Sequence, residues 1–314
     1  MKVLVTGGTG FIGSYLVEEL LRNGYEVRIL SRKSTTRWKN EVEIFRGDIT
    51  KPETLDKAFK GIDAVFHNAA YAMDFGKKEI IYDVNVSGTK NVAEACIRND
   101  IDRIVYTSSA GVYGFPKTDT VITEDFPKKP MNAYQKSKLL GEKILKEYED
   151  IRTSIVRPPL VFGAGGQTTK ILLDMLTSKS MVLIGDGNNI ISIVHPADVA
   201  RCLRLALERD DRGETFNVVS FTVKIGEFIE KLIERLGVEK PEKRVPFWIA
   251  YTLATLHEFI SSNPKITRFR VRALASNRII SCEKARRVLG YKPTFDLEKT
   301  IEDMIRWYNQ SGKK

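Results

Sequence analysis

A tyrosine and a lysine lie one helical turn apart in the segment Tyr134-Gln135-Lys136-Ser137-Lys138. The surrounding residues have helical periodicity, so positions i and i+4 share a face and the phenol of Tyr134 lies near the ammonium of Lys138. A phenol titrates near ~10, and a neighbouring positive charge favours its ionised form. We therefore expect the pair to act as an acid and base, with the pKa of Tyr134 below its ordinary value.

A serine earlier in the chain supplies a second hydroxyl. Ser109 follows residues 103–107, a predicted strand, and so lies at the carboxyl edge of a sheet, where open α/β sheets bind ligands. Its hydroxyl can hold the substrate oxygen that Tyr134 protonates or deprotonates. Each of these residue types is common at surfaces, and a serine after a strand is often only a cap. Ser109, Tyr134 and Lys138 together are the candidate catalytic set.

Glycines cluster between a predicted strand, residues 2–6, and a predicted helix, residues 11–22. The run reads Thr6-Gly7-Gly8-Thr9-Gly10-Phe11-Ile12-Gly13, in which Gly8, Gly10 and Gly13 have the spacing of the dinucleotide fingerprint. That fingerprint requires a tight turn, backbone close to a pyrophosphate, and a helix whose amides and positive end face the phosphates. The residues predicted to line this site are Gly7, Gly10, Phe11, Ile12 and Gly13.

The residues after the second predicted strand favour NADP over NAD. Folds that bind NAD usually place an acidic residue there, roughly 20 residues after the glycines, to hold the ribose 2′-hydroxyl. This chain has Ser31-Arg32-Lys33 instead. A hydroxyl and two cations can hydrogen-bond and neutralise a 2′-phosphate, which a carboxylate repels. We expect NADP to be favoured and NAD to be possible; the alternative is that these cations belong to an ordinary solvated loop.

Strand-like and helix-like segments alternate along the first two thirds of the chain. Predicted strands are residues 2–6, 26–30, 42–45, 63–67, 103–107, 153–157, 190–194 and 215–218; predicted helices are residues 11–22, 52–59, 79–98, 133–148 and 197–207. Continuous apolar strands joined by right-handed crossovers predict an α/β fold with a doubly wound parallel sheet of the Rossmann type. We expect a dinucleotide-binding domain at 1–157, completed by 189–219. Residues 158–188 and 220–314 form a smaller, mostly helical substrate-binding part.

Composition narrows the class of protein. The chain has 314 residues and a formal net charge of +10, but its cations are mixed with carboxylates and no basic block with interleaved aromatic residues occurs. We therefore expect no nucleic-acid partner. Three Cys and three scattered His form neither a disulfide framework nor a zinc pattern, which predicts a reduced compartment and no metal. The chain begins without an apolar signal region, so we expect a cytoplasmic protein.

The longest apolar stretch, residues 247–256, is about half of the ~20 residues that a membrane-spanning helix needs. We expect residues 245–259 to form part of the core or a lid over an apolar substrate. A membrane contact is disfavoured because the stretch is short and lacks a clear basic face.

These motifs together resemble the extended short-chain dehydrogenase/reductase family. The resemblance rests on the glycine run, His67-Asn68-Ala69-Ala70, Asn85, Ser108-Ser109-Ala110-Gly111-Val112-Tyr113-Gly114 and the Tyr-x-x-x-Lys motif. It implies that Ser109, Tyr134 and Lys138 are catalytic and that the protein forms a homodimer. Further cofactor contacts that it implies are Asp48 and Ile49 at the adenine, Ala69 and Ala70 along the cleft, Asn85 as support for the active site, and Pro158.

Two departures from the family's motifs narrow the range of reactions that we expect. Dehydratases of the family carry Asp-Glu where this chain has Ala110 and Gly111, which argues against elimination of water. Nucleotide-sugar epimerases typically have an Asn after strand six, whereas this chain reads Arg157-Pro158-Pro159 and resembles the 3β-hydroxysteroid dehydrogenase and dihydroflavonol reductase branch.

We therefore expect an NAD(P)-dependent enzyme that interconverts a secondary alcohol and a ketone on a hydrophobic small molecule. The alternatives are a UDP-sugar 4-epimerase that retains NAD and a non-catalytic cofactor-sensing protein. A sugar diphosphate needs convergent cations. The cations that can supply them are Arg157, Lys170, Arg268 and Arg270.

Overall fold

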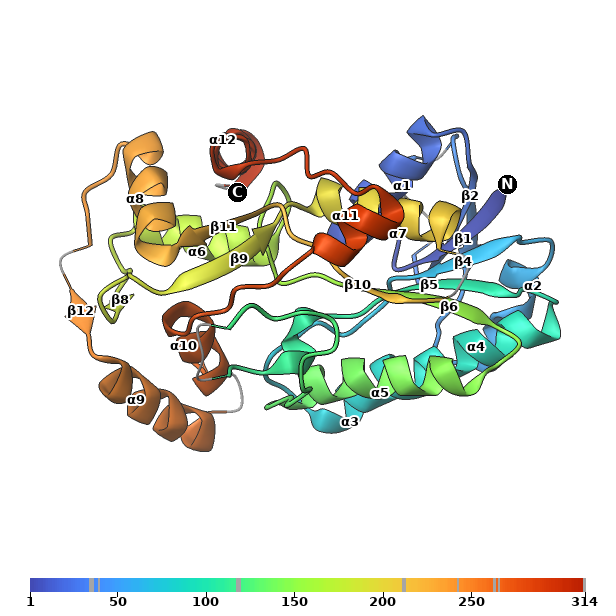
Figure 1. Ribbon diagram of the computed structural model, residues 1–314, viewed down its shortest axis with the longest axis horizontal. Helices are drawn as coiled ribbons and strands as arrows, with labels where there is room; N and C mark the ends of the chain where they lie inside the picture. The colour runs from blue at the N-terminus through green and yellow to red at the C-terminus, as the bar shows by residue number, and fades with distance from the viewer. Residues whose placement is uncertain are drawn as a thin grey trace.

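Seven parallel strands form the main sheet of the computed structural model (Figure 1). The structure describes residues 1–33, 37–38, 40–116, 120–210, 213–241, 243–261, 264 and 266–312. The strands are β1 (Lys2–Thr6), β2 (Glu26–Ser31), β3 (Glu43–Arg46), β4 (Ala64–His67), β5 (Arg103–Thr107), β6 (Arg152–Arg157) and β10 (Thr215–Asn217). Their spatial order is β10-β6-β5-β4-β1-β2-β3, and every neighbouring pair is parallel. This confirms the predicted doubly wound fold, in which the strand order reverses beside β1.

Helices cover both faces of this sheet. They are α1 (Phe11–Arg22), α2 (Asp56–Phe59), α3 (Lys78–Tyr82), α4 (Gly88–Arg98), α5 (Ala133–Glu147) and α7 (Pro196–Arg209). In the view of Figure 1, α1 and α7 lie above the sheet and α4 and α5 below it. Because side chains alternate along a strand, Val3 and Val5 of β1 join the apolar cluster of α1 and α7. Leu4, between them, joins the cluster of α2 and α4.

Two predicted helices are interrupted. The segment 52–59 is a 3-10 turn, η1 (Pro52–Thr54), followed by α2. The segment 79–98 contains a π-helical turn, η2 (Asp83–Ser87), between α3 and α4. The pattern of apolar residues does not reveal a π turn, because the turn adds one residue to a helix without requiring particular residue types. Such turns are frequent at functional sites.

A second layer of short strands lies beside the main sheet. A three-stranded sheet has the order β11 (Phe221–Lys224), β9 (Ile190–Val194) and β7 (Leu160–Val161), and β8 (Leu183–Ile184) pairs with β12 (Arg244–Val245). We assigned residues 189–219 to the dinucleotide-binding part. Of that range, α7 and β10 lie with the main sheet, whereas β9 belongs to the small sheet.

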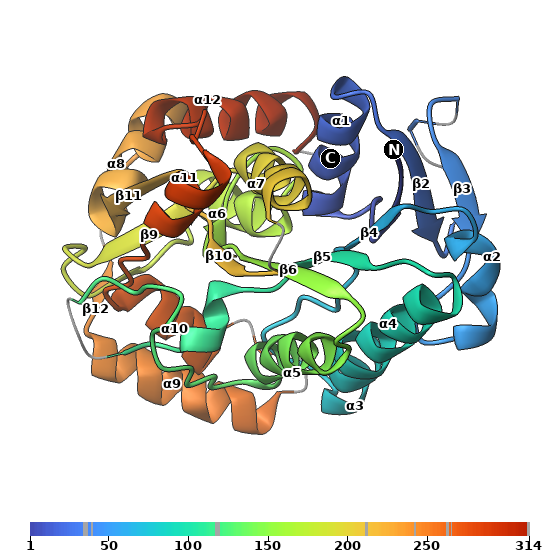
Figure 2. The same ribbon diagram turned by 45° about the vertical axis from the view of Figure 1, so that its right-hand side comes forward.

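Helices of the carboxyl-terminal part surround these short strands (Figure 2). They are α6 (Gln167–Thr177), α8 (Ile225–Leu236), α9 (Phe247–Ile260), α10 (Arg268–Ala275) and α12 (Leu297–Trp307), followed by the π turn η4 (Tyr308–Gly312). Helix α11 (Glu283–Leu289) packs instead against α7 and β10 of the main sheet. A third apolar cluster joins Leu173 of α6, Ile193 of β9, Phe228 of α8 and Ile301 of α12. This part is therefore held by its own core, next to the carboxyl edge of the main sheet.

Helix α9 lies at the surface (Figure 2). Only Ala250 and Ala254 of this helix are buried, whereas Trp248 is 68% exposed, Ile260 78% and Phe259 91%. We expected residues 245–259 to be core or lid; the core is wrong, because most of the large apolar side chains of this helix lie at the surface. The lid stays a prediction. No helix formed by the described residues is long and apolar enough to cross a bilayer.

Candidate functional site

The turn between β1 and α1 is shaped by glycines. Gly7 has a φ of +69°, and an added Cβ would lie 2.7 Å from the backbone of Ala69. A Cβ on Gly13 would lie 2.0 Å from the carbonyl oxygen of Gly7. The residue in the left-handed region is therefore Gly7 rather than Gly8, which packs over Ile29. The chain uses a Gly7, Gly10, Gly13 spacing, which corrects the fingerprint spacing read from the sequence.

This turn fits a dinucleotide pyrophosphate. Gly10 caps α1 without a side-chain hydrogen bond, and no acidic residue lies in the first turn, which contains Phe11 and Ile12. A Cβ on Gly10 would meet only the Gly7 carbonyl, at 3.2 Å. The amides and the positive end of a twelve-residue helix thus remain for an anion.

The end of β4 closes the other side of the turn. The Ala69 amide donates to Thr6 Oγ1 at 3.2 Å, and Asn68 Nδ2 donates to the Gly7 carbonyl at 3.4 Å. Ala69 and Ala70 are half-buried, as residues along a cleft would be. The structure therefore brings Ala69 beside the glycine turn, and Ala70 follows it in the chain.

The residues predicted at the adenosine lie at the neighbouring strand ends. Ser31 ends β2, and its hydroxyl accepts from the Lys33 amide at 3.1 Å. Arg32 and Lys33 are exposed, and neither forms an ion pair with any described residue. Asp48 accepts from the amide of Thr50 in the turn after β3.

Ile49, after the same turn, packs against α4. A Cβ on Gly88 would lie 2.8 Å from its side chain, and its carbonyl accepts from Asn91 at 2.8 Å. At the end of β6, the Pro158 carbonyl accepts from the Ala110 amide at 2.9 Å. Pro158 thereby lies beside the loop that carries Ser109.

The candidate catalytic residues meet at the carboxyl end of β5. Ser109 caps the 3-10 turn η3 (Ala110–Tyr113), accepts from the Gly111 amide at 3.0 Å, and lies close enough to the Tyr134 phenol to lower its pKa. Tyr134 lies in the first turn of α5, whose start is fixed by a capping box of Asn132 and Gln135. Lys138 follows one turn later on the same helix.

Lys138 is buried in an unusual environment. It is 2% exposed, and its Nζ lies 4.1 Å from the centre of the Tyr106 ring. Burial lowers its pKa to about 7, against a smaller opposing effect of Glu142. Because a buried ammonium lacks hydration, contact with the ring face offsets part of the desolvation cost.

The Tyr134 pKa differs from our expectation. Burial raises it to about 12, and the nearby Ser109 side chain opposes that rise without cancelling it. In the protein alone, the phenol is therefore protonated at neutral pH and suited to donate a proton.

A buried ion pair supports this site from behind. Arg157 at the end of β6 donates to both carboxylate oxygens of Glu142 on α5, at 2.7 and 2.5 Å. Ser108, next to Ser109, donates to the same carboxylate at 2.5 Å. The Arg157 guanidinium also donates to Tyr113 Oη at 2.8 Å. We missed Glu142 in the sequence, although its i, i+4 spacing from Lys138 was a signal.

Asn85 connects three segments around the same residues. Its side chain accepts from the Tyr71 amide at 2.7 Å, and donates to the Tyr71 carbonyl and, at 2.9 Å, to Ser137 Oγ. Thr89 Oγ1 donates to the Asn85 carbonyl at 2.8 Å. Asn85 lies in η2, so the π turn directs this amide toward α5. The structure therefore gives Asn85 a supporting position rather than a direct cofactor contact.

The four cations considered for a diphosphate each pair with a carboxylate. These pairs are Arg157 with Glu142, Lys170 with Asp174, Arg268 with Glu258, and Arg270 with Asp74. The first pair is buried, and the others hold neighbouring segments of the carboxyl-terminal part. A convergent phosphate site built from these four residues is not present.

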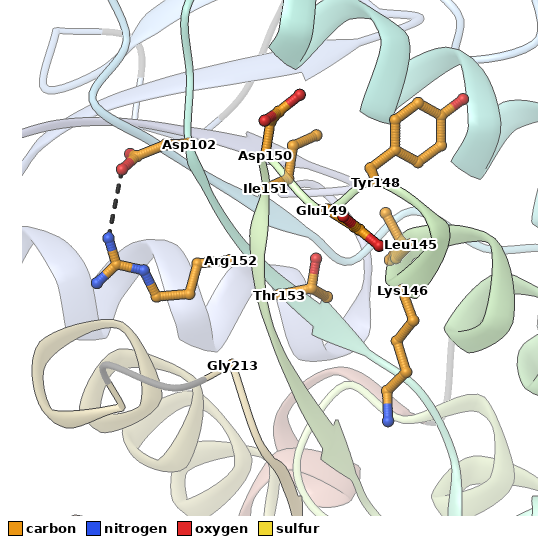
Figure 3. A pocket seen from close by; sticks show the side chains of 10 residues that line it. All are labelled: Asp102, Leu145, Lys146, Tyr148, Glu149, Asp150, Ile151, Arg152, Thr153 and Gly213. Atoms are coloured by element: carbon orange, nitrogen blue, oxygen red, sulfur yellow. Dashed lines mark hydrogen bonds and ion pairs between the residues drawn. The ribbon is translucent and has the colours of Figure 1, made fainter.

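A hollow of about 490 Å³ lies elsewhere on the protein (Figure 3). Its lining includes Asp102, Arg152 and Gly213, which precede or begin β5, β6 and β10, and also Tyr148 after α5. These positions are at the amino edge of the sheet, opposite the candidate site. None of the predicted site residues lines it.

Comparisons with known proteins place this site in context. The family described as NAD dependent epimerase/dehydratase matches residues 3–219. The mouse (Mus musculus) sterol-4-alpha-carboxylate 3-dehydrogenase, decarboxylating, is 30% identical over 99% of this chain and 92% of its own. The 2-alkyl-3-oxoalkanoate reductase of Stenotrophomonas maltophilia is 29% identical over 96% of this chain and 97% of its own. The structure of MoeE5 with UDP-glucuronic acid and NAD has a TM-score of 0.79 at 26% identity, covering 99% of this chain and all of that one.

The buried state of Lys138 predicts a pH-dependent stability difference for Lys138→Met. Folding lowers the Lys138 pKa from 10.5 to about 7, so between these values the unfolded chain binds more protons and the wild type gains stability as pH rises. The variant has no ionisable group at position 138, so its stability lacks this dependence on pH. Its unfolding free energy should therefore exceed that of wild type most at pH 6, with a smaller excess at pH 9, in urea denaturation. Lys136→Met, exposed on the same helix, is the control, and an excess that stays constant with pH would contradict the assignment.

Proposed function

The chain belongs to the NAD-dependent epimerase/dehydratase family, and on this premise we propose that it interconverts a secondary alcohol and a ketone on a hydrophobic small molecule. Its relatives are nicotinamide-dependent dehydrogenases and epimerases, and the protein is an enzyme of that kind. The observation that carries the proposal is the placement of Ser109 in the loop after β5 beside α5, which carries Tyr134 and, one turn later, the buried Lys138 packed on Tyr106 of β5.

These residues have distinct roles in the proposed reaction. The nicotinamide, when bound, supplies the hydride acceptor or donor. Ser109 holds the substrate oxygen, and Tyr134 moves the proton: the phenol donates it to a ketone oxygen in reduction, and the phenolate takes it from the alcohol in oxidation. Lys138, when protonated, stabilises the phenolate by its positive charge. The raised Tyr134 pKa suits the reducing direction in the free enzyme.

The substrate class is inferred from charge and from the relatives. The four cations that a sugar diphosphate would need already meet carboxylates, which favours an uncharged or singly charged molecule over a UDP-sugar. The names of the two relatives describe a sterol and an alkyl-substituted alkanoate, both rich in apolar surface. In each name, position 3 reacts and the molecule carries a carboxylate. A hydrophobic substrate gains ~25 cal/mol per Å² of apolar surface removed from water.

We propose NADP as the preferred cofactor. Arg32 and Lys33 are exposed at the end of β2 without an ion pair among the described residues, whereas Arg37 pairs with Glu18. Two unneutralised cations beside the Ser31 hydroxyl suit a 2′-phosphate.

Tyr134→Phe tests the acid and base. Removal of one hydroxyl should lower turnover by ~10² to 10⁴ while cofactor affinity changes little, because the glycine turn is untouched. Steady-state rates and cofactor titration measure the two quantities. Tyr148→Phe, at the far end of α5, is the matched control and should keep full activity. Retention of more than a tenth of wild-type turnover by Tyr134→Phe at its optimal pH would remove Tyr134 from this role.

Arg32→Asp tests the cofactor preference. A charge-assisted contact of this kind is worth ~1 to 3 kcal/mol, so NADP affinity should fall by that much more than NAD affinity. Dissociation constants for both cofactors decide it. Lys60→Asp, exposed at the opposite edge of the sheet, should leave their ratio unchanged. Tighter binding of NAD than NADP by the wild type would refute the preference.

A further inference from the structure

Arg278 is a buried arginine next to the proposed active site. It lies between α10 and α11 and is 5% exposed. Its backbone is held against β9, since its amide donates to the Ile190 carbonyl at 2.8 Å and its carbonyl accepts from the Ser192 amide at 3.1 Å. The side chain leaves this fixed backbone and reaches the loop after β5, where Nη2 donates to the Ala110 carbonyl at 3.0 Å.

This guanidinium has no carboxylate partner among the residues that the structure describes. Arg278 forms no ion pair with any of them, and none of them accepts a hydrogen bond from its buried Nε. Its other contact is the Phe115 ring, whose centre lies 4.9 Å from Cζ. Burial lowers the Arg278 pKa to about 10, and no neighbouring charge contributes to that shift. The side chain is therefore a cation at neutral pH.

The other buried arginines among the described residues each have a carboxylate partner. Arg28 meets Glu43 and Arg157 meets Glu142. An uncompensated buried charge is costly, and a buried donor without an acceptor calls for an explanation such as a ligand. One hydrogen bond to a neutral carbonyl and one ring contact do not neutralise it.

The position of the charge identifies the ligand. Ala110 directly follows Ser109, which holds the reacting oxygen in the proposed function, so the carbonyl that the guanidinium contacts belongs to the next residue along the chain. The adjacent apolar wall is formed by Phe115 and Phe269, whose ring centres are 5.6 Å apart. The site therefore offers one positive charge beside an aromatic surface.

We propose that Arg278 binds a carboxylate that the substrate carries close to its reacting carbon, so that the enzyme selects hydrophobic hydroxy or keto acids over their neutral counterparts. This inference rests on the proposed alcohol and ketone chemistry. One guanidinium matches the single charge of a carboxylate and its two acceptor oxygens. A diphosphate carries more charge than one arginine neutralises, and the other candidate cations are already paired.

The test compares an acid with its ester in wild type, Arg278→Met and Arg278→Lys. The probes are a long-chain 2-alkyl-3-hydroxy acid and its methyl ester, with kcat and KM followed by nicotinamide absorbance. Wild type should prefer the acid by at least tenfold in kcat/KM. Arg278→Met should lower kcat/KM for the acid by roughly 10- to 100-fold, mainly through KM. The ester should lose much less, so the preference disappears, and Arg278→Lys should restore part of it.

Arg268→Met is the matched control, because Arg268 pairs with Glu258 at the surface and should leave both rates unchanged. A role limited to holding the Ala110 loop predicts equal losses for acid and ester, and that result overturns the proposal. If Arg278→Met does not fold, wild type alone decides: a ratio of acid to ester near one overturns it, and a ratio above ten supports it. Failure of the proposed function looks different, because then neither the acid nor the ester reduces the cofactor.

Discussion

The ion pair between Arg157 and Glu142 fixes the elements that carry the reacting groups. Both side chains are almost fully buried, and together they join the end of β6, the middle of α5 and, through Ser108, the loop after β5. Loss of either partner would leave an uncompensated charge in the interior, which is strongly destabilising. Tyr134 and Lys138 lie on the same helix as Glu142, and Ser109 follows Ser108. The position of each proposed catalytic group thus depends on a charge pair that does not itself touch the substrate.

Burial has opposite effects on the two titratable groups of this site. It raises the pKa of Tyr134 and lowers that of Lys138, so the protein alone disfavours both charged forms. An ionised phenol then requires positive charge from a bound ligand as well as from the lysine. The charge of Arg278 lies at the loop that carries Ser109, where it donates to the Ala110 carbonyl. Few water molecules screen charges in this buried region, so each nearby charge has a large effect on the pKa values of Tyr134 and Lys138.

Local patterns in the sequence predicted much of this arrangement. The bounds of β1, α1 and β5 agree with the predicted ranges, and the i, i+4 spacing correctly placed Tyr134 and Lys138 on one helix. The π turn around Asn85, the left-handed Gly7 and the exposure of α9 depend on tertiary packing, and no local sequence pattern indicates them. Arg278 shows the limit most clearly. It lies 168 residues from Ala110 along the chain, and only the pairing of its backbone with β9 brings the two together.

The proposed enzyme transfers hydride between a free cofactor and a hydrophobic substrate. The most direct measurement incubates the protein with NADP⁺ and either a hydrophobic secondary alcohol or UDP-glucose. Nicotinamide absorbance and chromatography of the sugar nucleotide follow the two reactions. We expect net cofactor reduction with the alcohol and unchanged UDP-glucose. Formation of the sugar epimer without net cofactor reduction, and no reaction with the alcohol, would contradict this proposal and identify an epimerase.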